Sequence, residues 1–298
     1  MRRDIEFDAD GLTLRGWLYL PESSVAPVPT IVMAHGFSAV KEQYLDDFAV
    51  AFASCGLAVL VYDNRNFGAS EGEPRQEIDP ILQVRDYRHA ITFARTLPEV
   101  DGERIGVWGT SFSGGHVLMV GAIDRRVKCV VSQVPTISGP EAAPRRTRAD
   151  LVPNLLAAFD ADREGRFSGK APQTIPVVAE DETTPCVLPG KESWDFFSAS
   201  MARAPSYRNE ITLRSGEMAR EYEPGSWVHR ISPTPLLMIV ADKDTVTPTD
   251  LALDAFECAR RPKKLLLLSG GHFVPYVEQF DRTSAAAVDW FQEHLMAG

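Results

Sequence analysis

Short apolar runs alternate along the chain with longer segments in which apolar residues recur at helical spacing. The runs fall at residues 30–34, 58–62, 104–108, 127–131, 235–241 and 264–268. Strands that are buried on both faces give continuous apolar runs of this kind, and strands that are separated by helices must pair in parallel. The pattern therefore predicts a doubly wound, mostly parallel sheet with helices on both faces.

The segments of helical period lie between these runs and after the last one. They cover residues near 43–55, 80–97, 112–123, 249–260 and 281–296. The second of them carries a start signal, because Asp79 can cap a helix whose first position is Pro80. Ahead of all these elements, residues 4–9 and 12–20 alternate apolar and polar side chains around Asp10-Gly11, which predicts an antiparallel hairpin.

The alternation stops between residues 136 and 233. This stretch is rich in Pro, Arg and aromatic residues and shows no clear succession of strands and helices. A long segment between two sheet strands, with its own aromatic content, is better explained as a cap or lid than as a loop. We expect residues 1–135 and 234–298 to form one core, into which 136–233 is inserted.

Composition narrows the class of protein. The chain has 298 residues, is 44% hydrophobic and carries a formal charge of −10, which is typical of a soluble globular protein. The acidic balance argues against nucleic acid as the main partner, because phosphate binding needs clustered Lys and Arg. The four cysteines form no C-x-x-C pair and no metal-ligand spacing, so we expect reduced, structural thiols and no metal.

The N-terminus is charged where a signal peptide has its apolar region, and no apolar run approaches the length of about 18 residues that a membrane span needs. The sequence therefore predicts a cytoplasmic protein that does not contact a membrane.

The strongest chemical signal is the stretch 105–115, where an apolar run ends at Gly109 and a helical segment begins after Ser111. This is the setting of a nucleophile elbow, G-x-S-x-G, in which small residues allow the strand and the helix to approach closely. The last position is Ser113 instead of glycine, which is still small. Ser113 would point away from the strand edge, so Ser111 is the preferred nucleophile; the alternative is a plain Gly/Ser-rich turn.

A serine nucleophile needs a base and an orienting acid. Asp242 and Asp244 directly follow the run 235–241, and His272 directly follows the run 264–268. The carboxyl ends of parallel strands open on one edge of a sheet, where ligands bind. The turn before Val246-Thr247-Pro248 favours Asp244 over Asp242, and His272 lies in a Gly-Gly turn. The other histidines are expected to pack or to face solvent.

Acyl transfer also needs donors for the developing oxyanion. We expect these to be the backbone N–H groups of Phe37, which follows the run 30–34, and of Phe112, which follows the nucleophile. The imidazole of His35 is expected to brace its loop rather than transfer protons.

Taken together, these motifs resemble an α/β-hydrolase superfamily serine hydrolase. The resemblance rests on Ala34-His35-Gly36-Phe37, on the stretches 62–70 and 109–115, and on Asp244 and His272. The stretch 68–80 further resembles a branch that contains thiohydrolases, polyketide transferases, and acetylxylan-esterase-like or peptidase-like hydrolases. Membership implies an α/β-hydrolase fold with a mostly parallel eight-stranded sheet and an inserted cap. It also implies acyl hydrolysis without metal or organic cofactor.

The cap gives weaker hints about the substrate. Trp194, Phe197 and Trp227 are expected to form an apolar binding surface, although they could equally form the core of the cap. The cap also has arginines that could bind an anionic substrate, and a solvated charged face is the alternative. These arginines are Arg145, Arg146, Arg148, Arg163 and Arg166.

The leading hypothesis for function is a hydrolase of carboxylic esters, thioesters or lactones that acts on a small-molecule acyl substrate, with a homodimer as a candidate assembly. A peptidase or amidase, an acyltransferase, and a non-catalytic ligand-binding protein of the same fold are the alternatives.

Overall fold

A computed structural model describes residues 1–22, 27–181 and 183–296. Its centre is an eight-stranded sheet with the order β1-β2-β4-β3-β5-β6-β9-β10. The strands are β1 (Arg2–Ala9), β2 (Leu12–Tyr19), β3 (Val28–Ala34), β4 (Ala58–Tyr62), β5 (Val100–Thr110), β6 (Val127–Gln133), β9 (Leu236–Ala241) and β10 (Lys263–Leu268). The pairs β1–β2 and β2–β4 are antiparallel, and all later pairs are parallel. The predicted fold class is confirmed.

The N-terminal hairpin turns at Asp10 and Gly11, whose φ angles are 57° and 86°. Two positive φ angles at the centre of a two-residue turn match the right-handed twist of the flanking strands. The alternation seen in the sequence therefore corresponds to the antiparallel edge of the sheet.

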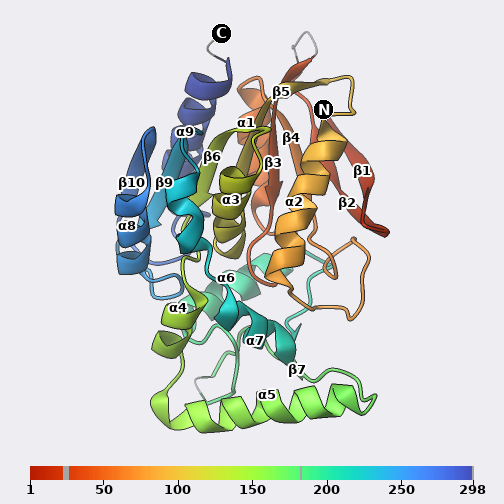
Figure 1. The fold of residues 1–298 in the computed structure, drawn as a ribbon, viewed down its shortest axis with the longest axis vertical. Helices are drawn as coiled ribbons and strands as arrows, with labels where there is room; N and C mark the ends of the chain where they lie inside the picture. The colour runs from red at the N-terminus through yellow and green to blue at the C-terminus, as the bar shows by residue number, and fades with distance from the viewer. Residues whose placement is uncertain (23–26, 182, 297–298) are drawn as a thin grey trace.

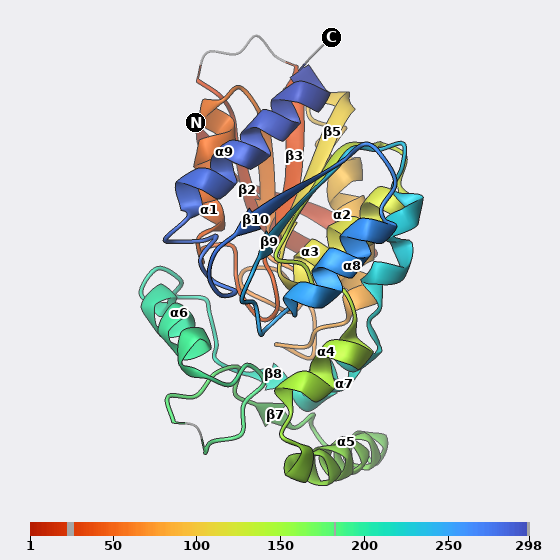
Figure 2. The same cartoon turned by 90° about the vertical axis from the view of Figure 1, so that its left-hand side faces the viewer.

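Helices cover both faces of the sheet (Figures 1 and 2). They are α1 (Leu45–Ser54), α2 (Pro80–Ala94), α3 (Phe112–Ile123), α8 (Thr249–Cys258) and α9 (Phe280–Phe291). Helices α1 and α9 lie on one face, and α2, α3 and α8 lie on the other (Figure 2). The predicted C-terminal helix ends earlier than expected, because residues Gln292–Met296 wind as a π-helix.

Every residue of β3, β4 and β9 is buried. This burial explains the continuous apolar runs, since neither face of these strands meets water. Large side chains fill the space between the sheet and its helices, among them Trp108, Phe48 and Phe52, all fully buried. The packed core thus holds the strand ends firmly at one edge of the sheet.

Residues 136–233, called the insertion below, connect β6 to β9. They form α4 (Gly139–Arg146), η1 (Ala149–Leu151), α5 (Val152–Phe167), β7 (Thr174–Ile175), α6 (Lys191–Met201), β8 (Ile211–Thr212), α7 (Leu213–Glu221) and η2 (Pro224–Arg230). Most of the insertion lies below the carboxyl ends of the parallel strands, with α5 outermost (Figure 1). No described helix is long and apolar enough to cross a membrane.

Candidate active site

Ser111 occupies a sharp turn between β5 and α3. Its backbone has φ 56° and ψ −116°, a conformation that L-residues rarely adopt and that is found mainly at functional sites. Gly109 permits this turn, because a Cβ atom there would lie 2.2 Å from the backbone oxygen of Ser113. The local sequence therefore folds as the elbow that was predicted and presents Ser111 at the edge of the sheet.

His272 and Asp244 lie beside Ser111 in a chain of hydrogen bonds. The Nε2 of His272 is 3.0 Å from the Oγ of Ser111, and its Nδ1 is 2.7 Å from the Oδ2 of Asp244. Asp244 follows β9 and His272 follows β10, and both side chains are almost fully buried. The structure thus brings together three residues that the sequence separates widely.

The turn after β9 decides between the two aspartates. The Oδ1 of Asp244 accepts hydrogen bonds from the backbone N–H groups of Val246 at 2.9 Å and Thr247 at 2.7 Å. Asp242 instead accepts from the backbone N–H of Gly270 at 2.9 Å. The structure therefore places Asp244, rather than Asp242, against the imidazole.

Thr247 adds a contact that the sequence analysis missed. Its hydroxyl donates to Asp244 Oδ2 at 2.8 Å and lies 3.2 Å from His272 Nδ1. In the sequence Thr247 was only part of a turn before Pro248, and no spacing marks it as a partner of His272. With this contact, both oxygens of Asp244 have hydrogen-bond partners.

The loop after β3 packs directly on the elbow. A Cβ atom at Gly36 would lie 3.0 Å from the Thr110 backbone oxygen and 3.1 Å from Ser111 Cβ, so glycine permits this approach. Among the described residues, neither Phe37 nor Phe112 donates its backbone N–H in a hydrogen bond. Both N–H groups are therefore without a hydrogen-bond acceptor in the part of the chain that the structure describes.

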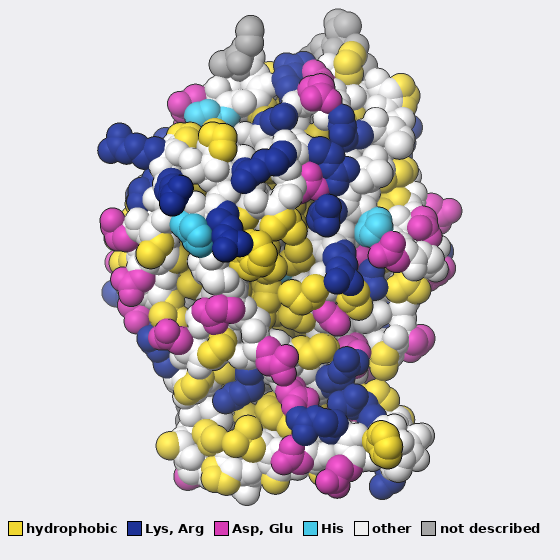
Figure 3. Space-filling view, viewed as in Figure 1, with side chains coloured by type: hydrophobic (Ala, Val, Ile, Leu, Met, Phe, Trp, Pro, Cys, Tyr) yellow, Lys and Arg dark blue, Asp and Glu magenta, His cyan; other side chains and the backbone are white. Residues whose placement is uncertain are grey.

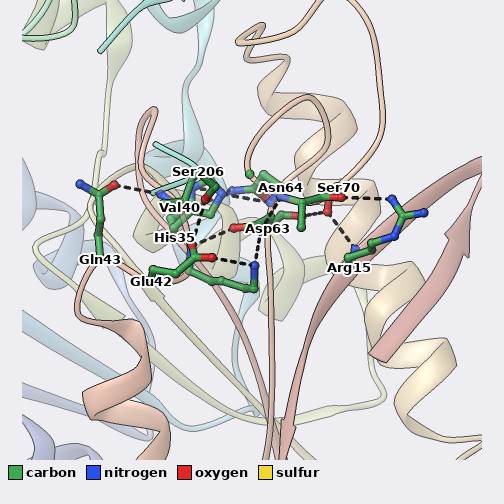
Figure 4. Close-up of polar contacts among 12 residues, drawn as sticks. Arg15, His35, Val40, Glu42, Gln43, Asp63, Asn64, Ser70 and Ser206 are labelled. Atoms are coloured by element: carbon green, nitrogen blue, oxygen red, sulfur yellow. Dashed lines mark hydrogen bonds and ion pairs between the residues drawn. The ribbon is translucent and has the colours of Figure 1, made fainter. Parts of the chain in front are cut away.

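A buried polar cluster braces this loop from behind (Figure 4). The Nε2 of His35 accepts a hydrogen bond from the Asn64 backbone N–H at 3.0 Å, and burial lowers the pKa of His35. The Nζ of Lys41 lies 2.6 Å from Asp63 Oδ2, and Asp63 Oδ1 accepts from the Lys41 backbone N–H at 2.8 Å. His35 thus occupies the bracing position that was expected for it.

A narrow pocket with a cavity volume of about 30 Å³ opens beside Ser111. It is lined by Gly36, Phe37, Ala39, Gln43, Leu45, Thr110, Ser111, Leu188, Phe196, Phe197, His272, Phe273 and Tyr276. Most of these side chains are apolar, and Leu188, Phe196 and Phe197 come from the insertion. The pocket therefore presents a mostly apolar surface beside Ser111.

The three aromatic residues that were expected to form a binding surface lie in different places. Phe197 lines the pocket, but Trp194 and Trp227 do not. Trp227 lies on η2, beside α3 and α8, where the Arg230 guanidinium covers its ring at 5.1 Å. Phe196, which the sequence analysis did not select, stacks on Phe273 with ring centroids 4.3 Å apart. The insertion thus contributes Phe197, which was expected, and Phe196, which was not, to the pocket beside His272.

Four of the five arginines that the sequence analysis considered for anion binding pair with carboxylates. The pairs are Arg145 with Asp250, Arg148 with Asp150, Arg163 with Asp160, and Arg166 with Asp162. These pairs favour the charged-face alternative for the four residues. Arg146 differs, because its guanidinium donates to the Val246 backbone oxygen and burial lowers its pKa to about 10.

The insertion also contacts the turn that carries His272. Glu192, in the first turn of α6, accepts a hydrogen bond from the Phe273 backbone N–H at 3.3 Å. A Cβ atom at Gly271 would lie 2.2 Å from a Glu192 carboxylate oxygen, so a side chain there would displace this carboxylate. No sequence signal pointed to Glu192, because the contact joins two segments about 80 residues apart.

A second hollow lies on another part of the surface. It is lined by Asp10, Arg85, Arg88, His89, Thr92 and Arg126. Lys and Arg side chains gather in the upper half of the face shown in Figure 3. Asp124 neutralises part of the charge, since it pairs with both Arg88 and Arg126.

The described residues contain no group of three or more His, Cys, Asp and Glu side chains that could hold a metal ion.

Comparisons with known proteins identify the family of the chain. Residues 10–274 match the family described as X-Pro dipeptidyl-peptidase (S15 family). The chain is 36% identical to a thiohydrolase of Eupenicillium brefeldianum over 277 residues, covering 91% of this chain and 87% of that protein.

Two solved structures share the whole fold. The α/β hydrolase GrgF from Penicillium sp. sh18 superimposes with a TM-score of 0.86 at 31% identity, covering 99% of each chain. DcsB in complex with its substrate analogue gives a TM-score of 0.88 at 30% identity, covering 100% of each chain.

Proposed function

The chain belongs to the X-Pro dipeptidyl-peptidase (S15) family of the α/β-hydrolases and is a hydrolase-type enzyme, and on this basis we propose that it cleaves a carboxylic ester, thioester or lactone through an acyl-enzyme. The observation that carries the proposal is the hydrogen-bonded chain Ser111–His272–Asp244 beside an apolar pocket. Ser111 is the proposed nucleophile, His272 the base and Asp244 the orienting acid.

In the first half-reaction, Ser111 Oγ attacks the acyl carbonyl carbon while His272 Nε2 takes the hydroxyl proton. The resulting imidazolium donates its Nδ1–H to Asp244, whose negative charge stabilises it. The tetrahedral intermediate then collapses, and His272 returns the proton to the departing alcohol or thiol. In the second half-reaction water attacks the acyl-enzyme by the same proton transfers, which releases the acid and restores Ser111.

The backbone N–H groups of Phe37 and Phe112 are the proposed oxyanion donors. They are held by the backbone, so they require no reorganisation when the negative charge develops. Removal of one such donor in comparable enzymes costs a factor of about 10² to 10³ in kcat.

The pocket supports a neutral, apolar acyl group. None of its described lining residues is Asp or Glu, so the pocket offers no carboxylate to pair with the free amino group of a peptide substrate. A relative named thiohydrolase further supports a thioester. We propose that the insertion acts as a cap, because Leu188, Phe196 and Phe197 close the pocket over Ser111.

The test is turnover of p-nitrophenyl esters and acyl thioesters of graded chain length, compared with aminoacyl anilides. We expect the esters or thioesters to be cleaved and Ser111→Ala to lose nearly all turnover while it remains folded. A fluorophosphonate probe should label the wild-type chain at Ser111. Cleavage of anilides alone would favour the peptidase alternative, and an unlabelled, inactive wild type would favour a non-catalytic protein.

A further inference from the structure

The elbow departs from G-x-S-x-G at Ser113, and the hydroxyl of this residue forms hydrogen bonds to the backbone. Ser113 is fully buried in the first turn of α3. Its Oγ accepts a hydrogen bond from the Thr110 backbone N–H at 2.9 Å and lies 2.7 Å from the Ala34 backbone oxygen, to which it donates. A glycine at this position would offer neither bond. The hydroxyl therefore joins two backbone groups that belong to different strands.

These two groups lie where the pairing of β3 with β5 ends. The last pair in the register is Ala34 opposite Gly109. Beyond it, the Thr110 N–H and the Ala34 C=O are linked through Ser113 Oγ. The hydroxyl thus adds one bridged rung to the sheet, next to the point where both strands turn into loops.

A second hydroxyl reinforces the same place. The Tyr87 hydroxyl accepts from the Ala34 backbone N–H at 2.9 Å and donates to the Trp108 backbone oxygen at 3.1 Å. Both backbone groups of Ala34 are therefore tied to β5 or to the elbow by buried side chains. The end of β3 cannot shift against the end of β5 without breaking these bonds.

We propose that Ser113 is a positioning residue that fixes the spacing of the two oxyanion donors. Phe37 follows Ala34 by three residues, and Phe112 follows Thr110 by two, so the bridge lies at the base of both donor-bearing segments. Gly36 also packs closely against the Thr110 backbone oxygen, because a Cβ atom there would lie 3.0 Å from it. The effect of the bridge on catalysis rests on the proposed function. The existence of the bridge does not.

The proposal makes an unusual prediction about the motif. Ser113→Gly creates the consensus G-x-S-x-G, yet it should impair the site because the bridge is lost. Ser113→Ala removes the bridge without the added backbone freedom of glycine. Ser132→Ala is the matched control: Ser132 is equally buried, and its hydroxyl donates to the Gly114 backbone oxygen at 2.9 Å, away from β3.

Two measurements test the proposal. Hydrogen exchange at the Thr110 amide should accelerate about tenfold or more in both Ser113 variants and stay unchanged in Ser132→Ala. The rate of Ser111 phosphonylation by a fluorophosphonate should fall about tenfold or more in the same two variants. With an ester substrate, kcat should fall in parallel while KM stays within about twofold, because the donors act on the transition state.

The outcomes separate the two proposals. Unchanged exchange at Thr110 in both Ser113 variants would overturn the bridge. Faster exchange with an unchanged phosphonylation rate would overturn its role in positioning the donors. Loss of reactivity in Ser113→Gly alone would assign the effect to backbone freedom and also overturn the bridge. A wild-type chain whose Ser111 never reacts would overturn the proposed function, while exchange at Thr110 would still decide whether the bridge exists.

Discussion

The Nδ1 of His272 lies 2.7 Å from the Oδ2 of Asp244, and the same carboxylate accepts three hydrogen bonds from Val246 and Thr247. Ionised carboxylates only accept hydrogen bonds, so Nδ1 must carry a proton in this pair. The neutral imidazole is then held in the tautomer whose Nε2 faces Ser111 with a lone pair. In the proposed mechanism, this lone pair is positioned to take the Ser111 proton before any substrate binds.

Asp244→Asn should abolish this preference. An amide can present its N–H₂ group to Nδ1, which favours the tautomer that carries its proton on Nε2. We expect kcat to fall by about 10⁴ with little change in fold, as in the comparable substitution of other serine hydrolases. Ester turnover and circular dichroism measure the two quantities.

Asp242→Asn is the control for that experiment. Asp242 lies on the same turn but bonds the Gly270 backbone N–H and not the imidazole. We expect its kcat to stay within about threefold of wild type, since no proton transfer depends on it. Equal losses of kcat in the two variants would show that the effect comes from a disturbed turn and not from the loss of the Asp244 carboxylate.

Phe196→Ala should shift the acyl-chain preference to longer chains. The ring stacks on Phe273 and lines the pocket, so its removal enlarges the space beside Ser111. The optimum in a series of p-nitrophenyl esters should move by about two or more carbons, since a phenyl ring exceeds that volume. Trp194→Ala, on the same helix but outside the pocket, should leave the optimum unchanged. A shift in both variants would contradict the placement of Phe196.

Lys41→Met should destabilise the fold through its buried partner. Without Lys41 Nζ, the buried Asp63 carboxylate loses its ion pair, and we expect the free energy of unfolding to fall by about 3 kcal/mol. Adding Asp63→Asn should recover part of this loss, because the unpaired charge is then gone. Urea unfolding measures both. Lys191→Met breaks an exposed pair with Asp195 and should cost less than about 1 kcal/mol.

His116 should make the protein less stable in mild acid. It is buried between the Tyr222 hydroxyl at 2.8 Å and Gln83 Oε1 at 3.0 Å, and burial lowers its pKa from 6.5 to about 3. In the unfolded chain the imidazole of His116 is protonated as the pH falls below about 6.5, whereas in the folded chain it is protonated only near pH 3. The contribution of His116 to stability is therefore complete above pH 6.5 and declines as the pH falls toward 3.

The corresponding experiment compares urea unfolding at pH 7.5 and pH 5. His116→Gln keeps a donor and an acceptor but cannot be protonated, so it should remove about 2 kcal/mol of the difference between the two pH values. His229→Gln alters an exposed histidine and should leave the difference as in wild type. The idea fails if the two variants have the same pH dependence.

The sheet and the placement of Ser111, Asp244 and His272 at its edge could be predicted, because the physical requirements for both leave a local pattern in the sequence. A strand with both faces buried must be apolar throughout, as β3 and β9 are. The elbow needs small residues on either side of Ser111, and parallel strands bring Asp244 and His272 to the same edge.

The insertion could not be predicted in the same way. In α5 only Phe159 and Asp162 are buried, so the helix has no apolar stripe that would reveal its period. Trp194 and Phe196 are two positions apart on α6, and helical residues at that spacing do not share a face. Which of them reaches the pocket depends on how α6 docks against the core, and the local pattern does not contain that information.

The docking of α6 also links His272, the proposed base, to Phe196 in the pocket wall. Glu192 holds the Phe273 backbone, Phe196 rests on the Phe273 ring, and Arg203 at the far end pairs with Asp46 and Asp47 of α1. A substrate too large for the pocket must displace this helix, and the displacement pulls on the segment that carries the imidazole. For the proposed reaction, we expect poorly fitting acyl groups to reduce the rate of proton transfer as well as binding.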